Sequence, residues 1–267
     1  MTKKFIAGGC SFTYGHELSD DDQGKTPSKK SWAHLLREQT DWDYVCAAKA
    51  GSGNSGIARR VFDAVSSFER DQIGGVVVMW SFLSRYDWAM PRHRELESTR
   101  WATISPWDTE TGNEEAFRHL TGSEGQQEQW KARRETFKET GVKDFAEAIY
   151  RYGANQYHET YLSWKSIIWL QNILERKNIP YMFTLADNTL FYQEFTHHKE
   201  QDAFMQALYS EIDFTKWHSF GERDMGFNQW AIMNDYERGT THPLDKAHKD
   251  ATMLMLPTFK KLIGDKK

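Results

Sequence analysis

The chain has 267 residues, of which 39% are hydrophobic and 14% aromatic, enough to bury a large core in one domain with room for an insertion. Its formal net charge of −4 argues against non-specific nucleic-acid binding, which requires a basic surface. The two cysteines, Cys10 and Cys46, cannot form a disulfide framework, and no apolar run approaches the roughly 20 residues of a membrane span. We therefore expect a cytoplasmic protein with reduced thiols that has no membrane or nucleic-acid partner.

Strands and helices alternate in the first third of the chain. Apolar runs at 5–8, 44–48 and 75–82 predict strands, and amphipathic stretches at 31–39 and 54–70 predict the helices between them. This alternation predicts a parallel sheet whose strands are joined by right-handed crossovers.

The pattern breaks at about residue 86 and does not resume until about residue 155. This stretch is polar, contains scattered tryptophans and has helical patterns at 126–139 and 142–152. We interpret 86–155 as a mostly helical insertion. It could cover a cleft, decorate the surface or mediate self-association into an oligomer.

The α/β pattern then continues to the end of the chain. We expect a long helix at 157–177, a fourth strand at 181–186 and a last helix at about 244–263. The whole of 1–267 is therefore predicted to be one domain that carries the insertion.

The first strand is followed at once by Gly8-Gly9-Cys10-Ser11. Glycines permit a tight turn, and ligands of open α/β sheets bind beyond the carboxyl ends of the strands. Ser11 is therefore a candidate nucleophile at that edge. The alternative is a glycine–serine turn without chemistry.

A second glycine loop follows the second strand. Gly51, Gly53 and Gly56 fit the G-x-G-x-x-G pattern of dinucleotide-binding loops, although that loop normally follows the first strand. A P-loop is excluded here because this loop has no Gly-Lys-Ser/Thr. The simpler interpretation is a glycine turn with a helix cap from Ser52 or Asn54.

His242 precedes Pro243, which suits the first turn of the last helix. A histidine held in this way could act as the base that a weakly nucleophilic serine needs. The alternatives are a surface histidine and a metal site with Asp245 and His248, whose remaining ligands would be unidentified.

The order of these motifs resembles the SGNH (GDSL-like) hydrolase family. Gly-x-Ser follows the first strand, a glycine/asparagine loop the second and a polar turn the third, and His-Pro opens the last helix. The chain looks most like the tailed-phage-type members, in which Gly-Cys-Ser-Phe-Thr replaces Gly-Asp-Ser. The resemblance covers 3–85 and about 181–267. It implies a flavodoxin-like three-layer α/β/α sandwich, located in the host cytoplasm if the chain is phage-encoded.

The resemblance also implies roles for individual residues. Ser11 falls on the nucleophile position, His242 on the base position and Gly51 on the oxyanion glycine position, with the Ser11 N–H as a further oxyanion donor. The asparagine that usually follows the third strand is absent. Asn54 or Ser81 is therefore the candidate third oxyanion donor.

The acid of the family normally lies three residues before the histidine, and that position is Gly239. We expect Asp235 or Asp245 to replace it, or a backbone carbonyl to orient the imidazole ring. Trp80 and Arg85, beside the turn after the third strand, are candidate substrate contacts.

We therefore expect a serine esterase that hydrolyses a small O-acyl ester, with acetyl esters as candidates, through an acyl-enzyme and without a metal or organic cofactor. Its expected partner is the small-molecule ester substrate. The alternatives are an O-acyltransferase that uses the same site, a non-catalytic ligand-binding module of the same fold and a dinucleotide-binding protein.

Overall fold

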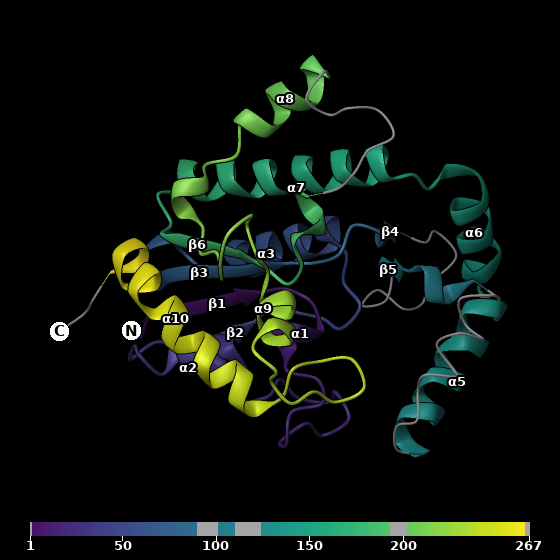
Figure 1. The fold of residues 1–267 in the computed structure, drawn as a ribbon, viewed down its shortest axis with the longest axis horizontal. Coiled ribbons are helices and arrows are strands. Elements are labelled where there is room, and N and C mark those ends of the chain that lie inside the picture. The colour runs from purple at the N-terminus through teal and green to yellow at the C-terminus, as the bar shows by residue number, and fades with distance from the viewer. Residues whose placement is uncertain (1, 90–100, 110–123, 193–201, 265–267) are drawn as a thin grey trace.

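The centre of the molecule is a four-stranded parallel sheet, seen between helices in Figure 1. The computed structural model describes residues 2–89, 101–109, 124–192 and 202–264. The sheet has the strand order β2-β1-β3-β6, so β1 is an inner strand and β2 an edge. The strands are β1 (Lys4–Gly8), β2 (Asp43–Cys46), β3 (Ile73–Trp80) and β6 (Tyr181–Leu185).

Successive side chains of each strand enter two separate hydrophobic clusters. In β1, Phe5 and Ala7 belong to one cluster and Ile6 to the other. All eight residues of β3 are buried, as expected for a parallel strand that is covered on both faces. The near-continuous apolar runs in the sequence are therefore explained by burial on both sides of the sheet.

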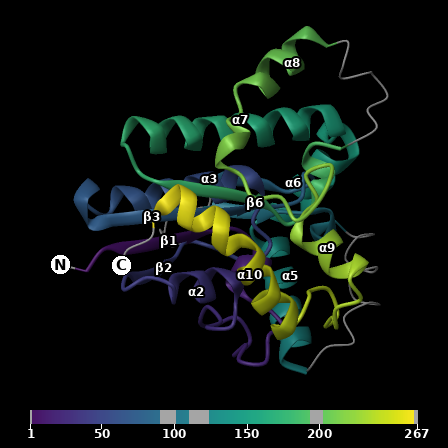
Figure 2. The same cartoon turned by 60° about the vertical axis from the view of Figure 1, so that its left-hand side comes forward.

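Two layers of helices cover the sheet. Figure 2 shows α3 (Asn54–Ser66) and α7 (Gln156–Arg176) over one face, and α2 (Trp32–Arg37) and α10 (Asp245–Ile263) over the other. This arrangement confirms the predicted three-layer α/β/α sandwich with a parallel sheet.

The remaining elements are short and connect these layers. The α-helices are α1 (Ser11–Tyr14), α8 (Ala203–Ser210) and α9 (Phe227–Met233), and the 3-10 turns are Arg70–Gln72, Pro106–Asp108, Asn188–Leu190 and Phe214–Lys216. Within the ranges that the structure describes, no helix has both the length and the apolar character needed to cross a bilayer.

The described part of the predicted insertion at 86–155 is mostly helical, with a short strand pair in addition. Helices α5 (Glu124–Glu139) and α6 (Val142–Ala148) and the π-turn Ile149–Gly153 agree with the prediction. The prediction missed β4 (Tyr86–Ala89) and β5 (Trp101–Ile104), which pair antiparallel. Strands of four residues are too short to show a clear alternating pattern in the sequence. Positions 90–100 and 110–123 of the insertion lie outside the described residues.

The hairpin β4-β5 is fixed to the sandwich by an ion pair. Arg59 on α3 donates two hydrogen bonds, of 2.7 and 3.0 Å, to the carboxylate of Asp87 on β4. The hairpin shares a small hydrophobic cluster with α6, formed by Tyr86, Ile104, Val142 and Ala146. The insertion therefore begins with a segment that is packed against the main body.

One buried histidine links the two helices that cover the lower face of the sheet in Figure 1. His248 on α10 is fully buried, and its Nδ1 accepts a hydrogen bond of 3.1 Å from the N–H of Trp32 at the start of α2. Burial lowers the pKa of His248 to about 3. The imidazole is therefore neutral in the folded state at neutral pH.

This burial predicts an acid-sensitive fold. A folded-state pKa of about 3, against the ordinary histidine value of 6.5, means that the unfolded chain binds an extra proton between these pH values, so stability falls as the pH drops from 6.5. Asn at position 248 offers an oxygen acceptor to Trp32 but does not titrate. In urea unfolding at several pH values, we expect His248→Asn to lose less stability than the wild type between pH 6.5 and 4. The exposed control His158→Asn is expected to follow the wild type. Equal slopes in all three proteins would contradict the assignment.

Candidate active site

Ser11 is the first residue of α1, and only Gly9 and Cys10 separate it from Gly8 at the end of β1. The Cys10 carbonyl accepts hydrogen bonds from the N–H groups of Thr13 and Tyr14, which fixes the turn. The Ser11 N–H lies in the first helical turn, where no intrahelical acceptor exists, and no bond from it is found among the described residues. A hydroxyl and a free backbone N–H therefore lie together at the end of β1.

His242 brings an imidazole to this serine from the other end of the chain. Its Nε2 lies 2.7 Å from Oγ of Ser11, although the residues are 231 positions apart. This is hydrogen-bond distance, as a nucleophile and its general base require. The structure thus brings together the two residues predicted from the sequence to form the reactive pair.

The loop between α9 and α10 holds His242 in place. The N–H of Gly239 donates to the carbonyl of His242 at 2.9 Å, closing a tight turn. Helix α10 begins at Asp245 with Leu244 as its N-cap, so Pro243 precedes the helix and does not lie in its first turn as predicted. The imidazole therefore extends from a closed loop.

Glu17 is the acid partner of the imidazole. Its Oε2 lies 3.0 Å from Nδ1 of His242. The same oxygen accepts hydrogen bonds from the backbone N–H groups of Thr241, at 3.0 Å, and of His242, at 2.9 Å. Ser11, His242 and Glu17 therefore form a continuous hydrogen-bonded triad.

The electrostatics of this contact keep Glu17 ionised. Burial alone would raise the pKa of its carboxyl, but the hydrogen bonds from His242 and Thr241 outweigh burial and lower that pKa to about 2. An ionised carboxylate only accepts hydrogen bonds, so it assigns the ring proton of neutral His242 to Nδ1. Nε2 is then left with a lone pair directed at the Ser11 hydroxyl, as a general base requires.

The two acids predicted from the sequence are not partners of the histidine. Asp235 is exposed, and Asp245 accepts hydrogen bonds from Ser19 and Lys30. Both predictions were wrong. They considered only carboxylates close to His242 in the sequence. The carboxylate comes instead from Glu17, six residues after the nucleophile.

Gly239, the expected acid position, has a different role. A Cβ atom placed on Gly239 would lie 2.7 Å from Oε2 of Glu17, closer than a Cβ atom comes to an oxygen atom to which it is not bonded. The absence of a side chain at Gly239 therefore makes room for the carboxylate that replaces the usual acid.

The loop after α1 is built to present Glu17. The backbone of Glu17 has φ 66°, a left-handed conformation that is uncommon for residues other than glycine. Asp21 stabilises this conformation, because its carboxylate accepts the N–H of Glu17 at 2.8 Å and that of Gly24 at 2.8 Å. The acidic stretch 20–22 thus includes a structural brace for the triad.

Gly51 lies on a loop that is bound to the nucleophile loop. The N–H of Lys49 donates to the carbonyl of Gly9 at 3.1 Å, which aligns the segment after β2 with the segment that carries Ser11. No hydrogen bond from the Gly51 N–H is found within the described ranges. This placement is compatible with the predicted oxyanion role.

Asn54 and Ser81, the candidate third donors, are bonded to each other. The Asn54 amide donates to the Ser81 carbonyl at 3.1 Å and to Oγ of Ser163 at 3.0 Å, and accepts the Ser81 N–H at 2.8 Å. Both amide hydrogens are therefore in use. The Ser81 hydroxyl accepts a hydrogen bond from Arg85 at 3.0 Å. As an oxyanion donor, each residue stays a prediction.

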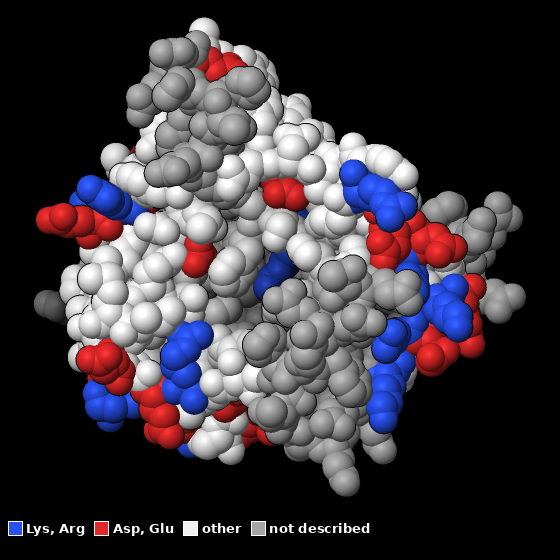
Figure 3. Space-filling view, turned by 45° about the vertical axis from the view of Figure 1, so that its right-hand side comes forward, with Lys and Arg blue, Asp and Glu red and all other residues white. Residues whose placement is uncertain are grey.

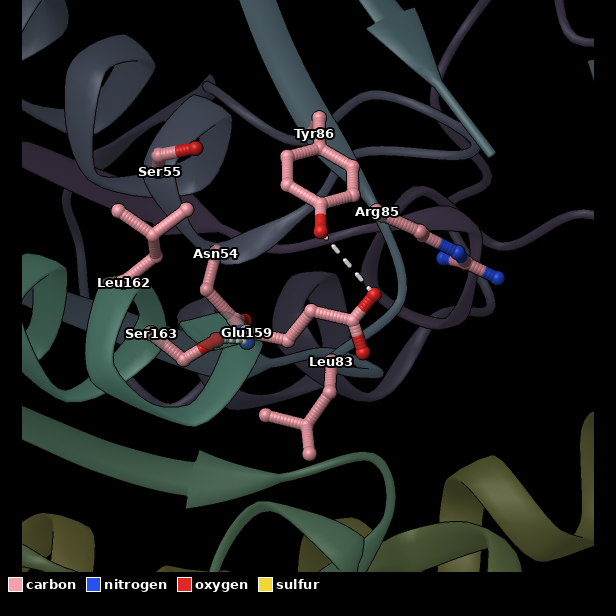
Figure 4. Close-up of a pocket in the computed structure, with 8 residues that line it drawn as sticks. All are labelled: Asn54, Ser55, Leu83, Arg85, Tyr86, Glu159, Leu162 and Ser163. Carbon is pink, nitrogen blue, oxygen red and sulfur yellow. Dashed lines mark hydrogen bonds between the residues drawn. The ribbon is translucent and has the colours of Figure 1, made fainter. Parts of the chain in front are cut away.

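Trp80 is not a substrate contact. It is fully buried in the core, with its ring centroid 5.3 Å from that of Phe183. The sequence prediction was wrong because Trp80, the last residue of β3, lies in the hydrophobic cluster between the sheet and helices α3 and α7. Arg85, the other candidate, is partly exposed and lines a pocket with Asn54 and Glu159 (Figure 4).

The histidines and the aspartate considered for a metal site point to different partners. His248 bonds to the N–H of Trp32, and Asp245 bonds to Ser19 and Lys30. Within the described part of the chain, no three His, Cys, Asp or Glu side chains are placed to hold a metal ion. The structure does not bring His242, Asp245 and His248 together.

Comparison with known proteins gave matches in structure only. No family model matches the chain, and no curated protein does. Its fold is similar to that of the psychrotrophic esterase EstA from Pseudoalteromonas sp., with 11% identity, coverage of 97% of both chains and a TM-score of 0.46. It is also similar to a member of the lipolytic protein G-D-S-L family from Veillonella parvula, with 11% identity, coverage of 98% and 100%, and a TM-score of 0.45.

A third similar structure is the acetyl xylan esterase Est2A from Butyrivibrio proteoclasticus. The identity is 10%, the TM-score is 0.43, and the match covers 97% of this chain and 64% of that one. All three TM-scores are below 0.5, so nothing about the site or activity of this protein follows from these likenesses.

The triad predicts that the reactivity of Ser11 depends on Glu17. Glu17→Gln keeps the size of the side chain but removes the charge that holds the Nδ1 tautomer. We expect the rate of Ser11 phosphonylation by a fluorophosphonate to fall by about 10²–10⁴-fold, measured by mass spectrometry. Asp235→Asn is the matched control and should react like the wild type. A Glu17→Gln protein with wild-type reactivity would show that the carboxylate has no role.

The room left by Gly239 gives a second, steric prediction. In Gly239→Ala the new methyl group must displace the carboxylate of Glu17, so we expect Ser11 phosphonylation to slow by about tenfold or more. The control is Gly153→Ala, where an added Cβ has no neighbour within 4 Å. Thermal unfolding of both variants separates a local effect from a loss of fold. Unchanged reactivity in folded Gly239→Ala would refute the steric argument.

Proposed function

We propose that this protein is a serine esterase of the SGNH type that hydrolyses a small O-acyl ester through an acyl-enzyme. The observation that carries the proposal is the hydrogen-bonded series of Ser11 Oγ, His242 and Glu17. Nucleophile, base and acid have the geometry of an acyl-transfer site, and roles in such sites are recognised from geometry and not from sequence order.

The first half of the reaction forms the acyl-enzyme. Oγ of Ser11 attacks the ester carbonyl while Nε2 of His242 takes the hydroxyl proton. The resulting imidazolium is stabilised by the charge of Glu17, and it passes the proton to the oxygen of the departing alcohol. The second half repeats these steps, with water as the nucleophile and Ser11 as the leaving group.

The negative charge that develops on the carbonyl oxygen needs donors. The backbone N–H groups of Ser11 and Gly51 are the candidates, because no protein acceptor for either is found among the described residues. A donor of this kind typically contributes on the order of 10²–10³ in rate. These two N–H groups therefore supply an oxyanion site without the amide of Asn54.

A small acyl group fits the burial of the reactive atoms. Ser11 is only 7% exposed, and the side chain of His242 is 12% exposed. Access to the hydroxyl is thus narrow, which favours a short acyl chain such as acetyl over a long one.

The proposal predicts labelling and hydrolysis that both depend on Ser11. We expect a fluorophosphonate to add to the wild type at Ser11, and p-nitrophenyl acetate to be hydrolysed. Ser11→Ala should lose labelling completely and lower the hydrolysis rate by about 10³-fold or more, because the nucleophile is gone. The exposed serine variant Ser67→Ala is the matched control.

Two results would overturn the proposal. One is a wild-type protein, folded by circular dichroism, that neither reacts with the probe nor hydrolyses the ester. The other is ester hydrolysis that survives Ser11→Ala at the wild-type rate, which would assign the activity to another group.

A further inference from the structure

Arg85 is not used by the mechanism above, yet the fold places it at the same edge of the sheet as Ser11. Its backbone lies against the loop after β2, since a Cβ on Gly53 would be 2.3 Å from the Arg85 carbonyl oxygen. Its guanidinium donates to the hydroxyl of Ser81, just after β3, at 3.0 Å. Strand β1 lies between β2 and β3, and Ser11 follows β1. Arg85 therefore contacts the segments that follow β2 and β3, the two strands on either side of β1.

A series of aromatic contacts also links Arg85 to the triad. The guanidinium lies over the ring of Phe82, 4.9 Å from its centroid. Phe82 is 6.1 Å from Phe12, and Phe12 is 4.7 Å from the imidazole of His242. The rings fix the position of the cation relative to the catalytic base.

The charge of Arg85 has no counter-ion in the part of the chain that the structure describes. No Asp or Glu of that part forms an ion pair with it, and one of its five N–H donors bonds to Ser81. Arg59 provides the contrast, because its guanidinium is paired with both carboxylate oxygens of Asp87.

The carboxyl group that shares a pocket with Arg85 is directed elsewhere. Figure 4 shows Glu159 bonded to the hydroxyl of Tyr86, at 3.2 Å, while the Arg85 side chain extends away from this pair. Burial raises the pKa of the Glu159 carboxyl, and its hydrogen-bond partner is the hydroxyl of Tyr86. Glu159 is therefore not the partner of this guanidinium.

Figure 3 shows one face of the molecule in a space-filling view. A hollow opens near the centre of the view, and a Lys or Arg side chain lies inside it. The chain as a whole has a net charge of −4, so the positive charge within this hollow differs in sign from the overall charge of the protein.

We propose that Arg85 is a specificity residue that binds an anionic group of the substrate, so that the preferred esters carry a carboxylate or a phosphate near the scissile bond. A guanidinium binds such groups through two parallel hydrogen bonds, which fixes both charge and orientation. A neutral acetyl ester needs no cation at this edge of the sheet. The inference rests on the proposed esterase function and adds the substrate class.

The test compares charged and neutral esters of matched shape. On the alcohol side, the pair is para-acetoxybenzoate and para-acetoxybenzamide. On the acyl side, it is the p-nitrophenyl monoester of adipic acid and the p-nitrophenyl ester of adipamic acid. We expect the wild type to prefer the charged member of at least one pair by about tenfold or more in kcat/KM, as a charge-assisted hydrogen bond would give.

Three variants assign the preference to the guanidinium. Arg85→Gln removes the charge and should abolish the preference, through a loss of kcat/KM with the charged ester. Arg85→Lys keeps the charge but loses the two parallel N–H donors of the guanidinium, and it should retain part of the preference. Arg151→Gln is the matched control, because Arg151 is exposed and its guanidinium also lies beside an aromatic ring, that of Tyr152.

The outcomes separate this inference from the proposed function. Fluorophosphonate labelling of Ser11 without a charge preference in either pair would overturn the role of Arg85 and leave the esterase proposal intact. A preference that persists in Arg85→Gln would also overturn it. Absence of labelling in the wild type would refute the esterase proposal itself.

Discussion

The Oε2 atom of Glu17 joins the two ends of the chain. It accepts hydrogen bonds from two backbone N–H groups of the histidine loop and lies 3.0 Å from the imidazole nitrogen of His242. Because this oxygen bonds to both the backbone and the ring, it fixes the position of the loop and the tautomer of the base together. The 2.7 Å contact between His242 and Ser11 depends on that arrangement. Asp21, which accepts the N–H of Glu17, and Gly239, which has no side chain to displace the carboxylate, both help to keep this oxygen in place.

The sequence was sufficient to predict the sheet and the reactive pair. The strands, the helices between them and the turn before Ser11 are all local features, visible as apolar runs and glycines. Parallel strands end at a common edge, so a serine after the first strand and a histidine before the last helix could be expected to meet there. The structure confirms the sandwich and places the two side chains in contact.

The rest of the site depends on contacts that no local pattern reveals. Glu17 lies in a polar loop that resembles any solvated surface segment, and its backbone conformation is set by Asp21. A tryptophan at the end of a strand could line a cleft, but in the folded sheet the Trp80 side chain is buried in the core. Asn54 and Ser81 are 27 positions apart, and only the fold shows that they satisfy each other. The hairpin β4-β5 was missed because strands of four residues are too short to show a clear alternation of apolar and polar residues.

The position of Glu17 in the chain determines how the triad depends on the histidine loop. Nucleophile and acid belong to one short stretch, Ser11 to Glu17, and the base alone comes from the opposite end of the chain. An acid at position 239 would be part of the same loop as His242, so the two side chains would move together if that loop moved. Here, any displacement of the histidine loop breaks the hydrogen bonds of the imidazole to Ser11 and to Glu17 at once, while the contact with Thr241 of the same loop stays. The triad is therefore complete only while this loop is packed against the Ser11–Glu17 segment.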